Sequence, residues 1–264
     1  MTLPEGFPSI AYQKITVGSL LLIIGIYSVT IMPWLSLNQL IRIDRTLMLG
    51  LNNDEGQWMD QFWYAYSSFD AWTVAMAVIA LTLWRKCKGC CRQRLLFLLT
   101  VVLLFVLLDQ LSSGLIKPLA GRLRPSHDPV IAPLLHYVNG YHGGRYGFVS
   151  GHATNIAGLA TWLCLLFRDR LSRTVFILFA AALCYSRIYL GVHYPGDILC
   201  GALLGFTLSY AIFRIVSRYF SFQTNRRPRL LLYTIGLTVV VLFVYSACIV
   251  AANSPKPLLA ALFQ

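Results

Sequence analysis

Long apolar runs, separated by short basic segments, are the feature that most constrains how this chain can fold. Of its 264 residues 57% are hydrophobic and only 12% are charged, whereas soluble domains carry about 25% charged residues. A helix needs about 20 mostly apolar residues to cross a bilayer, and several runs have about that length. We therefore predict an all-α fold, namely a polytopic transmembrane helical bundle.

Seven apolar runs are expected to be spans: 15–37, 62–84, 95–116, 153–167, 174–190, 198–213 and 230–252. The stretch that follows the first run is rich in Trp and Tyr, which favour the level of the lipid headgroups, so we expect an interfacial segment there. The whole chain, 1–264, is expected to form one membrane domain. Its predicted parts are an N-terminal span with the interfacial segment (15–70), a catalytic core (about 95–213) and an extra C-terminal span (230–252). The first six spans are expected to form a six-helix core, to which the seventh is added.

The placement of the basic residues predicts an orientation. The net charge of +12 would favour nucleic-acid binding in a soluble protein, but here most Lys and Arg lie between apolar runs, so no nucleic-acid partner is expected. The segments 85–94, 168–173 and 214–229 fall on one side of a seven-span chain, which the positive-inside rule assigns to the cytoplasm. Asp109, an acid within a clear span, is expected to face the bundle or to bond to Ser112 or Ser113.

Three polar clusters end apolar runs on the opposite side: KPLAGRLRP (117–125), SGH (150–152) and SRIYLGVHYPGD (186–197). In the third, Pro195 favours the first turn of a helix, so His193 should lie just before that helix. Asp197 could accept the imidazole N–H and leave the other ring nitrogen free as a nucleophile. The same residues could equally form an ordinary helix cap, with Asp197 near the positive helix end.

The other two clusters also allow two interpretations. Ser150 is a natural N-cap at a helix N-terminus able to bind an anion, and His152 could donate a proton, although a capped helix with a polar His is the simpler alternative. A phosphoryl group carries about −1.5 to −2 charges, which the cations Lys117, Arg124 and Arg187 could neutralise. Snorkelling towards the headgroups would also place such cations near span ends, but it does not account for two histidines and an aspartate on the same side.

Taken together, K-x6-RP, SGH and SR-x5-H-x3-D resemble the three-part signature of the type 2 phosphatidic acid phosphatase (PAP2) superfamily, which includes membrane lipid phosphatases and soluble vanadium haloperoxidases. The resemblance covers roughly 95–213, and the preceding interfacial segment is also similar to that of bacterial members. Val149 stands where the family usually has Pro, and a seventh span exceeds the usual six.

No cluster of carboxylates, Cys or His in the sequence has the ligand spacing of a Mg or Zn site, so no metal or other cofactor is expected. The resemblance implies roles for eight residues. It implies that His193 is the nucleophile, that Asp197 is its partner and that His152 is the general acid. Phosphate would be bound by the remaining five residues: Lys117, Arg124, Ser150, Gly151 (through its amide) and Arg187.

These residues favour a membrane lipid phosphatase that acts through a phosphohistidine at the periplasmic face of a bacterial inner membrane. The candidate substrates are a polyprenyl diphosphate, phosphatidylglycerophosphate, phosphatidic acid and a lipid A phosphate; the sequence does not fix the oligomeric state. A lipid phosphotransferase of the same fold is an alternative. An anion transporter, with the basic cluster as its filter, is disfavoured by the two histidines and the aspartate. Eight loop residues are expected to line the approach to the site: His127, Asp128, His136, Tyr137, Asn139, Tyr141, His142 and Arg145.

Overall fold

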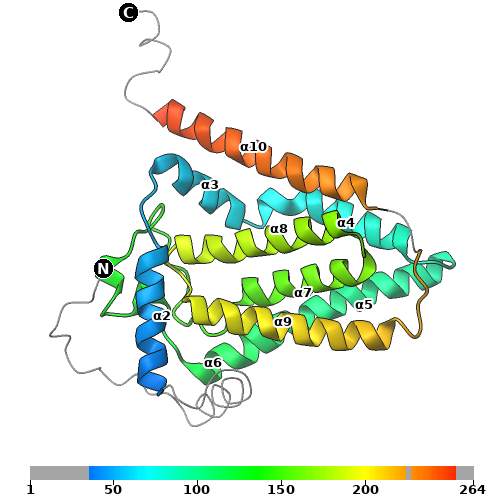
Figure 1. Ribbon diagram of the computed structural model, residues 1–264, viewed down its shortest axis with the longest axis horizontal. Helices are drawn as coiled ribbons and strands as arrows, with labels where there is room; N and C mark the ends of the chain where they lie inside the picture. Colours follow the sequence, from blue (N-terminus) through cyan, green and yellow to red (C-terminus); the bar gives the residue numbers. More distant parts are fainter. Residues whose placement is uncertain (1–35, 224–226, 254–264) are drawn as a thin grey trace, which may run out of the picture.

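The computed structural model describes residues 36–223 and 227–253, and within them the chain is helical, without a β-strand beyond two isolated bridges (Figure 1). The α-helices are α2 (Leu37–Leu51), α3 (Gln57–Ser67), α4 (Thr73–Lys86), α5 (Cys91–Asp109), α6 (Lys117–Ala120), α7 (Gly151–Leu166), α8 (Arg170–Tyr189), α9 (Pro195–Val216) and α10 (Arg229–Asn253). Short 3-10 turns cover Asp70–Trp72, Pro125–His127 and Ala132–Leu134. The predicted all-α bundle is confirmed.

Four described helical segments are long and apolar enough to cross a membrane: Cys91–Ala120, Arg170–Tyr189, Pro195–Val216 and Arg229–Asn253. A fifth span is possible if α3 and Asp70–Lys86, which meet at a 69° bend, act together. Helix α7 has 16 residues, fewer than the number usually needed to cross a bilayer. The expected first span, 15–37, lies outside the described residues but for the start of α2. The chain is thus a multi-pass membrane protein, and the count of seven spans stays a prediction.

Helix α2 runs across the end of the bundle, roughly perpendicular to α7, α8 and α9 (Figure 1). Its N-terminus is closed by a capping box, because Ser36 and Gln39 exchange side-chain to backbone hydrogen bonds. One face exposes Ile43 and Leu47, while Asp44 on the other face is buried. This amphipathic helix lies within the segment that we expected to be interfacial.

Helices α7 and α9 pack closely because small residues line their contact. A Cβ atom at Gly205 would lie 2.0 Å from the carbonyl oxygen of Thr154, and one at Gly201 would lie 2.6 Å from that of Ser150. Across the same contact, a Cβ at Gly158 would meet Ser209 Oγ at 2.8 Å. Gly201 and Gly205 form a G-x3-G pair of the kind that lets membrane helices approach closely.

A π-helical segment, Gln110–Ile116, separates α5 from α6. It brings Ser113 against the start of α7, where a Cβ at Gly151 would meet Ser113 Oγ at 2.8 Å. The first expectation for Asp109 is wrong, because this residue is exposed. The alternative is confirmed, because Ser113 Oγ donates to Asp109 Oδ1 at 3.4 Å.

The α7–α9 contact predicts that Gly205→Ala destabilises the protein by about 1–3 kcal/mol, the usual cost of overpacking a closely packed interior. The added methyl group meets backbone, which cannot rotate away as a side chain can. Thermal unfolding in detergent measures the effect. Gly236→Ala is the matched control, since no atom lies within 4 Å of a Cβ at this position in α10. Equal melting temperatures for the two variants would contradict the close contact.

Candidate active site

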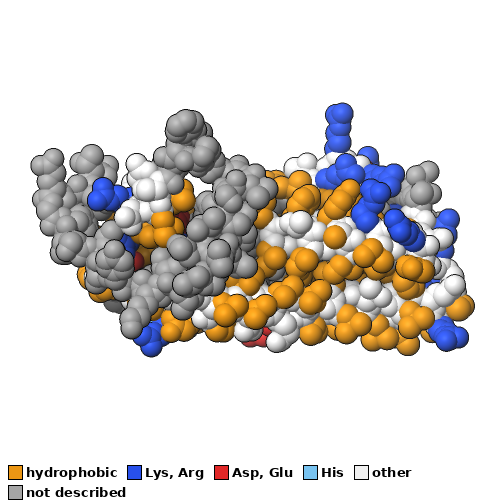
Figure 2. All heavy atoms as spheres, turned by 90° about the horizontal axis from the view of Figure 1, so that it is seen from below, with side chains coloured by type: hydrophobic (Ala, Val, Ile, Leu, Met, Phe, Trp, Pro, Cys, Tyr) orange, Lys and Arg blue, Asp and Glu red, His pale blue; other side chains and the backbone are white. Residues whose placement is uncertain are grey.

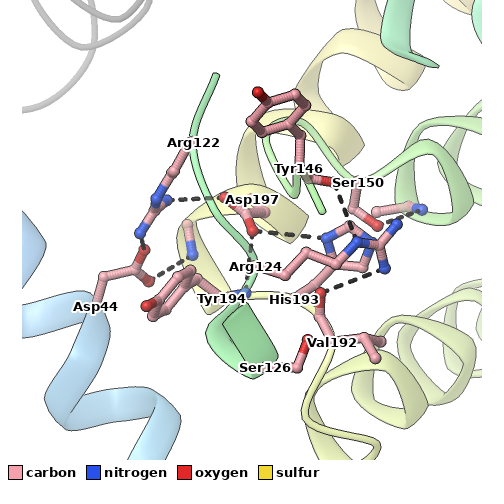
Figure 3. A network of polar contacts seen from close by, with 12 residues as sticks. Asp44, Arg122, Arg124, Ser126, Tyr146, Ser150, Val192, His193, Tyr194 and Asp197 are labelled. Carbon is pink, nitrogen blue, oxygen red and sulfur yellow. Dashed lines mark hydrogen bonds and ion pairs between the residues drawn. The ribbon is translucent and has the colours of Figure 1, made fainter. Parts of the chain in front are cut away.

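The structure gathers the residues predicted from the three clusters at one end of the bundle, and Figure 3 shows part of this group. Lys117 begins α6, and Arg124 lies in the loop that follows it. Arg187 is near the end of α8. Electrostatic interactions connect all three cations with His193 and with His152.

The start of α7 is fixed by its N-cap and by the start of α9. The Ser150 side chain accepts a hydrogen bond from the Ala153 amide at 3.4 Å, as predicted for an N-cap. The Ser150 amide donates to the Asp197 carbonyl at 3.0 Å. A Cβ at Gly151 would lie 3.9 Å from Lys117 Nζ, so the backbone at the positive end of α7 lies close to this ammonium group.

His193 and Asp197 form the buried centre of the group. His193 is 1% exposed, and its Nδ1 atom lies 3.5 Å from Asp197 Oδ2 without forming a hydrogen bond. Such contacts are often long before substrate binds and shorten in the complex. Helix α9 begins at Pro195 as predicted, and the Tyr194 amide donates to Asp197 Oδ2 at 3.1 Å. The carboxylate therefore caps the helix, as the second interpretation of this cluster expected, and it also lies next to the imidazole; the nucleophilic role of His193 stays a prediction.

Burial lowers the pKa of His193 well below its usual range, and Arg124, Arg187 and Lys117 lower it further. The ring is therefore neutral at physiological pH and keeps a lone pair for attack on phosphorus. Burial, followed by repulsion from Arg187, also lowers the pKa of Arg124. A bound dianion would relieve this repulsion among the cations.

Arg124 and Arg187 donate hydrogen bonds to protein atoms through only some of their N–H groups. Arg124 Nε donates to the Tyr146 carbonyl at 3.0 Å. Arg187 donates through Nη1 to Ser67 Oγ and through Nη2 to Tyr141 Oη at 3.2 Å. The Arg187 Nε atom is buried without a hydrogen-bond partner. This unsatisfied donor is available for a phosphate oxygen.

A second carboxylate and a further arginine complete the network, and the sequence analysis missed both. Arg122 Nη1 donates to Asp197 Oδ1 at 2.8 Å, and Arg122 Nη2 donates to Asp44 Oδ2 at 2.6 Å (Figure 3). Asp44 also accepts from the Gly196 amide at 2.7 Å. The Arg122 guanidinium lies 4.2 Å from the centre of the Tyr194 ring, a cation–π distance. Asp197 is thus held from both of its oxygens.

Burial raises the pKa of Asp44, and the facing Arg122 opposes that rise. A signal for Arg122 was present, because it lies within the KPLAGRLRP cluster. No comparable signal marked Asp44, which is 78 residues away from Arg122 along the chain.

Several of the eight loop residues expected at the approach form hydrogen bonds with other protein groups. Tyr137 Oη, for example, donates to the Ala132 carbonyl at 2.9 Å, and Asn139 Oδ1 accepts from Gln61 Nε2 at 3.2 Å. Asp128 is buried and accepts hydrogen bonds from Arg45 Nη2 and Tyr194 Oη, both at 2.7 Å. His136 Nε2 lies 2.8 Å from Asp60 Oδ1. In contrast, Tyr141 reaches Arg187.

The donor set suits a tetrahedral anion. Three cations interact with two imidazoles next to a helix N-terminus, and charge-assisted hydrogen bonds to phosphate are the strong ones. His152 is exposed, so a leaving group or water can reach it, whereas His193 is buried. Within the described residues, one group has metal-ligand spacing, Asp54, Asp60 and His136, and it contains none of the predicted site residues.

Comparison with known proteins agrees with this chemistry. A family model described as the PAP2 superfamily matches residues 94–221. The chain is 35% identical over 177 residues to a lipid A 4'-phosphatase of Porphyromonas gingivalis, covering 67% of this chain and 74% of the relative. It is 37% identical over 164 residues to a lipid A 4'-phosphatase of Bacteroides thetaiotaomicron, covering 62% and 72% of the two chains.

A solved structure shares the fold. The transmembrane PAP2-type phosphatidylglycerolphosphate phosphatase of Bacillus subtilis aligns with a TM-score of 0.54 and 19% identity, covering 76% of this chain and 96% of that one. At this identity the likeness supports the helical architecture alone.

We predict that Arg122→Gln lowers kcat by at least about 10-fold, equivalent to ~1.4 kcal/mol of activation free energy, with little change in KM. Arg122 positions Asp197 and does not lie among the cations that surround His193. Without Arg122 the Asp197 charge is less compensated, so it attracts a proton to His193 more strongly and raises the pKa of that ring. The acid limb of the pH–kcat/KM profile should therefore move to higher pH.

Arg45→Gln is the matched control. Arg45 donates to Asp128 Oδ2 through Nε and Nη2, at 3.1 and 2.7 Å, so it joins the same helix to the same loop region without reaching Asp197. Its pH profile should match that of the parent. Arg122→Lys should recover part of the rate, because one ammonium keeps the charge but cannot fork between two carboxylates. An unchanged profile in Arg122→Gln would contradict the positioning role.

Proposed function

This chain belongs to the PAP2 superfamily, and we propose that it hydrolyses the 4'-phosphate ester of lipid A. That it is a lipid phosphatase follows from the family and from the named activities of its relatives. The observation that carries the substrate proposal is the likeness to two lipid A 4'-phosphatases, which extends over about two thirds of this chain. A contiguous match of 177 residues in a chain of 264 can start no later than residue 88 (264 − 177 + 1), so it necessarily includes 88–177, with the first two clusters and the loop between them.

In the proposed mechanism, Lys117, Arg124 and Arg187 bind the phosphate oxygens, together with Ser150 and the Gly151 amide. The Arg187 contact with Tyr141 is exchanged for a contact with substrate. Phosphoryl transfer spreads charge over the equatorial oxygens in its transition state. Fixed cations around those oxygens therefore stabilise the transition state more than the ground state.

His193 and His152 have different roles in the covalent step. The free nitrogen of His193 attacks phosphorus, and the bond from phosphorus to the lipid oxygen breaks. Desolvation by the surrounding protein, followed by repulsion from Arg187, lowers the pKa of His152 to about 3 in the free site. His152 therefore takes up its proton when the bound phosphate offsets the cationic charge, and it then gives that proton to the lipid oxygen. Asp197 holds the His193 ring and stabilises the positive charge that it gains. Water then attacks the phosphohistidine, His152 takes a proton from the water, and inorganic phosphate leaves. No metal is needed to balance either step.

We further propose that the site faces the periplasm of a bacterial inner membrane. The basic turns between α4 and α5 and between α7 and α8 lie at the end of the bundle away from the start of α9 (Figure 1), and His193 lies just before α9. The positive-inside rule assigns such turns to the cytoplasm. The site end is then on the opposite side of the membrane.

A phosphate-release panel tests the substrate. Purified protein in detergent should release phosphate from bisphosphorylated lipid A faster than from phosphatidic acid, phosphatidylglycerophosphate or a polyprenyl diphosphate. Mass spectrometry of the product should place the loss at the 4' position. Activity should persist in EDTA. Faster turnover of a glycerophospholipid, or loss of the 1-phosphate, would contradict the proposal.

The phosphohistidine is tested separately with lipid labelled in its phosphate. We expect acid-labile, base-stable label on the protein, and we expect His193→Ala to abolish both label and turnover. His152→Ala should slow departure of the lipid, least for an analogue whose leaving group needs no proton. His142→Ala, an exposed loop histidine, is the control and should retain label. Label that survives in His193→Ala and disappears in His152→Ala would reverse the two roles.

A further inference from the structure

A cavity of about 860 Å³ lies at the end of the bundle opposite the active site. It is formed by the end of α4, by the turn between α7 and α8, by the end of α9 and by the linker that follows α9. Figure 2 shows Lys and Arg side chains gathered at one end of the molecule, on the right of that view. We call this space the basic cavity.

The wall of the basic cavity is held by backbone pairing. The Lys88 amide donates to the Ser221 carbonyl at 2.8 Å, and the Gln223 amide donates to the Lys86 carbonyl at 2.9 Å. Between these bonds, Cys87 and Phe222 form an isolated antiparallel bridge. The linker after α9 is therefore fixed against the turn after α4, which gives the cavity a defined wall.

Cations dominate the lining. Six of the lining side chains are basic: Lys86, Arg168, Arg173, Arg214, Arg218 and Arg227. Asp169 is the one acidic residue of the lining, and its carboxylate already caps α8 by accepting from the Ser172 amide at 3.1 Å. Its Oδ1 atom also lies 3.6 Å from Arg227 Nε. Within the described residues, no other ion pair involves a lining cation.

Lys86 is the least expected of these cations, because only 7% of it is exposed. Its ammonium lies 4.5 Å from the centre of the Phe167 ring. A buried lysine charge costs free energy unless a partner compensates for it. The aromatic ring offsets part of that cost, and an anion in the cavity would offset more.

The positive-inside rule accounts for the number of basic residues at this end but not for their arrangement. It favours Lys and Arg anywhere near the ends of spans, including outward-facing positions such as Lys88 and Arg92. It does not require six cations to converge on one cavity, nor a lysine to be buried there.

We infer that the basic cavity binds the phosphate headgroup of an anionic phospholipid, in the leaflet opposite the active site. The cavity lies at the ends of α4, α7 and α9, the level at which headgroups meet a spanning bundle. Basic pockets between membrane helices bind such headgroups, and its volume falls in the ~300–1,000 Å³ range of ligand pockets. Leu166, Phe213 and Phe222 in its lining suit the apolar part of a lipid next to its phosphate.

The test compares two double variants that lose the same charge from the same end of the protein. Arg214→Gln/Arg218→Gln removes two exposed cations of the lining. Lys88→Gln/Arg92→Gln removes two exposed cations that do not line the cavity. The full-length protein is placed in phosphatidylcholine nanodiscs and titrated with phosphatidylglycerol. This lipid carries a phosphodiester, so a phosphomonoesterase does not consume it.

Retained lipid is counted by native mass spectrometry, and thermal unfolding is followed in parallel. We expect the parent and the Lys88/Arg92 variant to bind phosphatidylglycerol and to gain thermal stability from it. Arg214→Gln/Arg218→Gln should bind at least 10-fold more weakly, while its melting temperature without added lipid stays unchanged. If that double variant unfolds, the single Arg218→Gln substitution replaces it, and a several-fold loss of affinity is expected.

Two outcomes would overturn the inference. If phosphatidylglycerol binding were weakened equally in both double variants, the affinity would depend on surface charge alone and not on the basic cavity. Stabilisation by inorganic phosphate that is lost in Arg214→Gln/Arg218→Gln, without binding of phosphatidylglycerol, would show that the cavity takes a free anion and not a lipid; phosphate bound at the active site would stabilise that variant and the parent alike. The inference does not rest on the proposed substrate, because the readout is lipid binding at the other end of the bundle and not turnover.

Discussion

The arrangement of the active site depends on one buried carboxylate, that of Asp197. A fully buried charge is tolerated only when it is paired and hydrogen-bonded, and the contacts of Asp197 come from its own cluster and from the two other clusters. The Arg122 guanidinium binds one oxygen, the Tyr194 amide and the His193 ring lie at the other, and the Asp197 carbonyl accepts from the Ser150 amide. The hydrogen bonds and the ion pair of Asp197 therefore hold the three sequence clusters together.

Glycine makes that convergence possible. The start of α7 carries Ser150, and the start of α9 carries Asp197, so the two helix ends must approach within hydrogen-bonding distance. They do so because Gly201 and Gly205 let the backbones of α7 and α9 come into contact. The same close approach continues along the helices through Gly158, and the interface therefore fixes both the depth and the rotation of the site residues.

The sequence predicted what local chemistry determines. Ser150 as an N-cap and Pro195 at a helix start follow from preferences that act over a few residues, and the lengths of the apolar runs predict most of the long helices. Asp44 and Ser67 were missed because their partners, Arg122 and Arg187, are 78 and 120 residues away along the chain. The orientation of Asp109 could not be predicted either, because α5 is apolar on all sides before it and its sequence therefore does not show which face points into the bundle.

The π-helical segment, Gln110–Ile116, makes the active site sensitive to chain length in a way that the rest of the membrane domain is not. Each residue advances an α-helix by about 100° and ~1.5 Å. Loss of one residue between Asp109 and Lys117 would therefore turn the Lys117 ammonium to a different face of the helix, although every other residue kept its identity. Helix α10 contains none of the site residues and is largely exposed along its length. Loss of one residue in its middle would only rotate the following α10 side chains about the helix axis. Tolerance of insertions and deletions should thus differ sharply between two helices of similar composition.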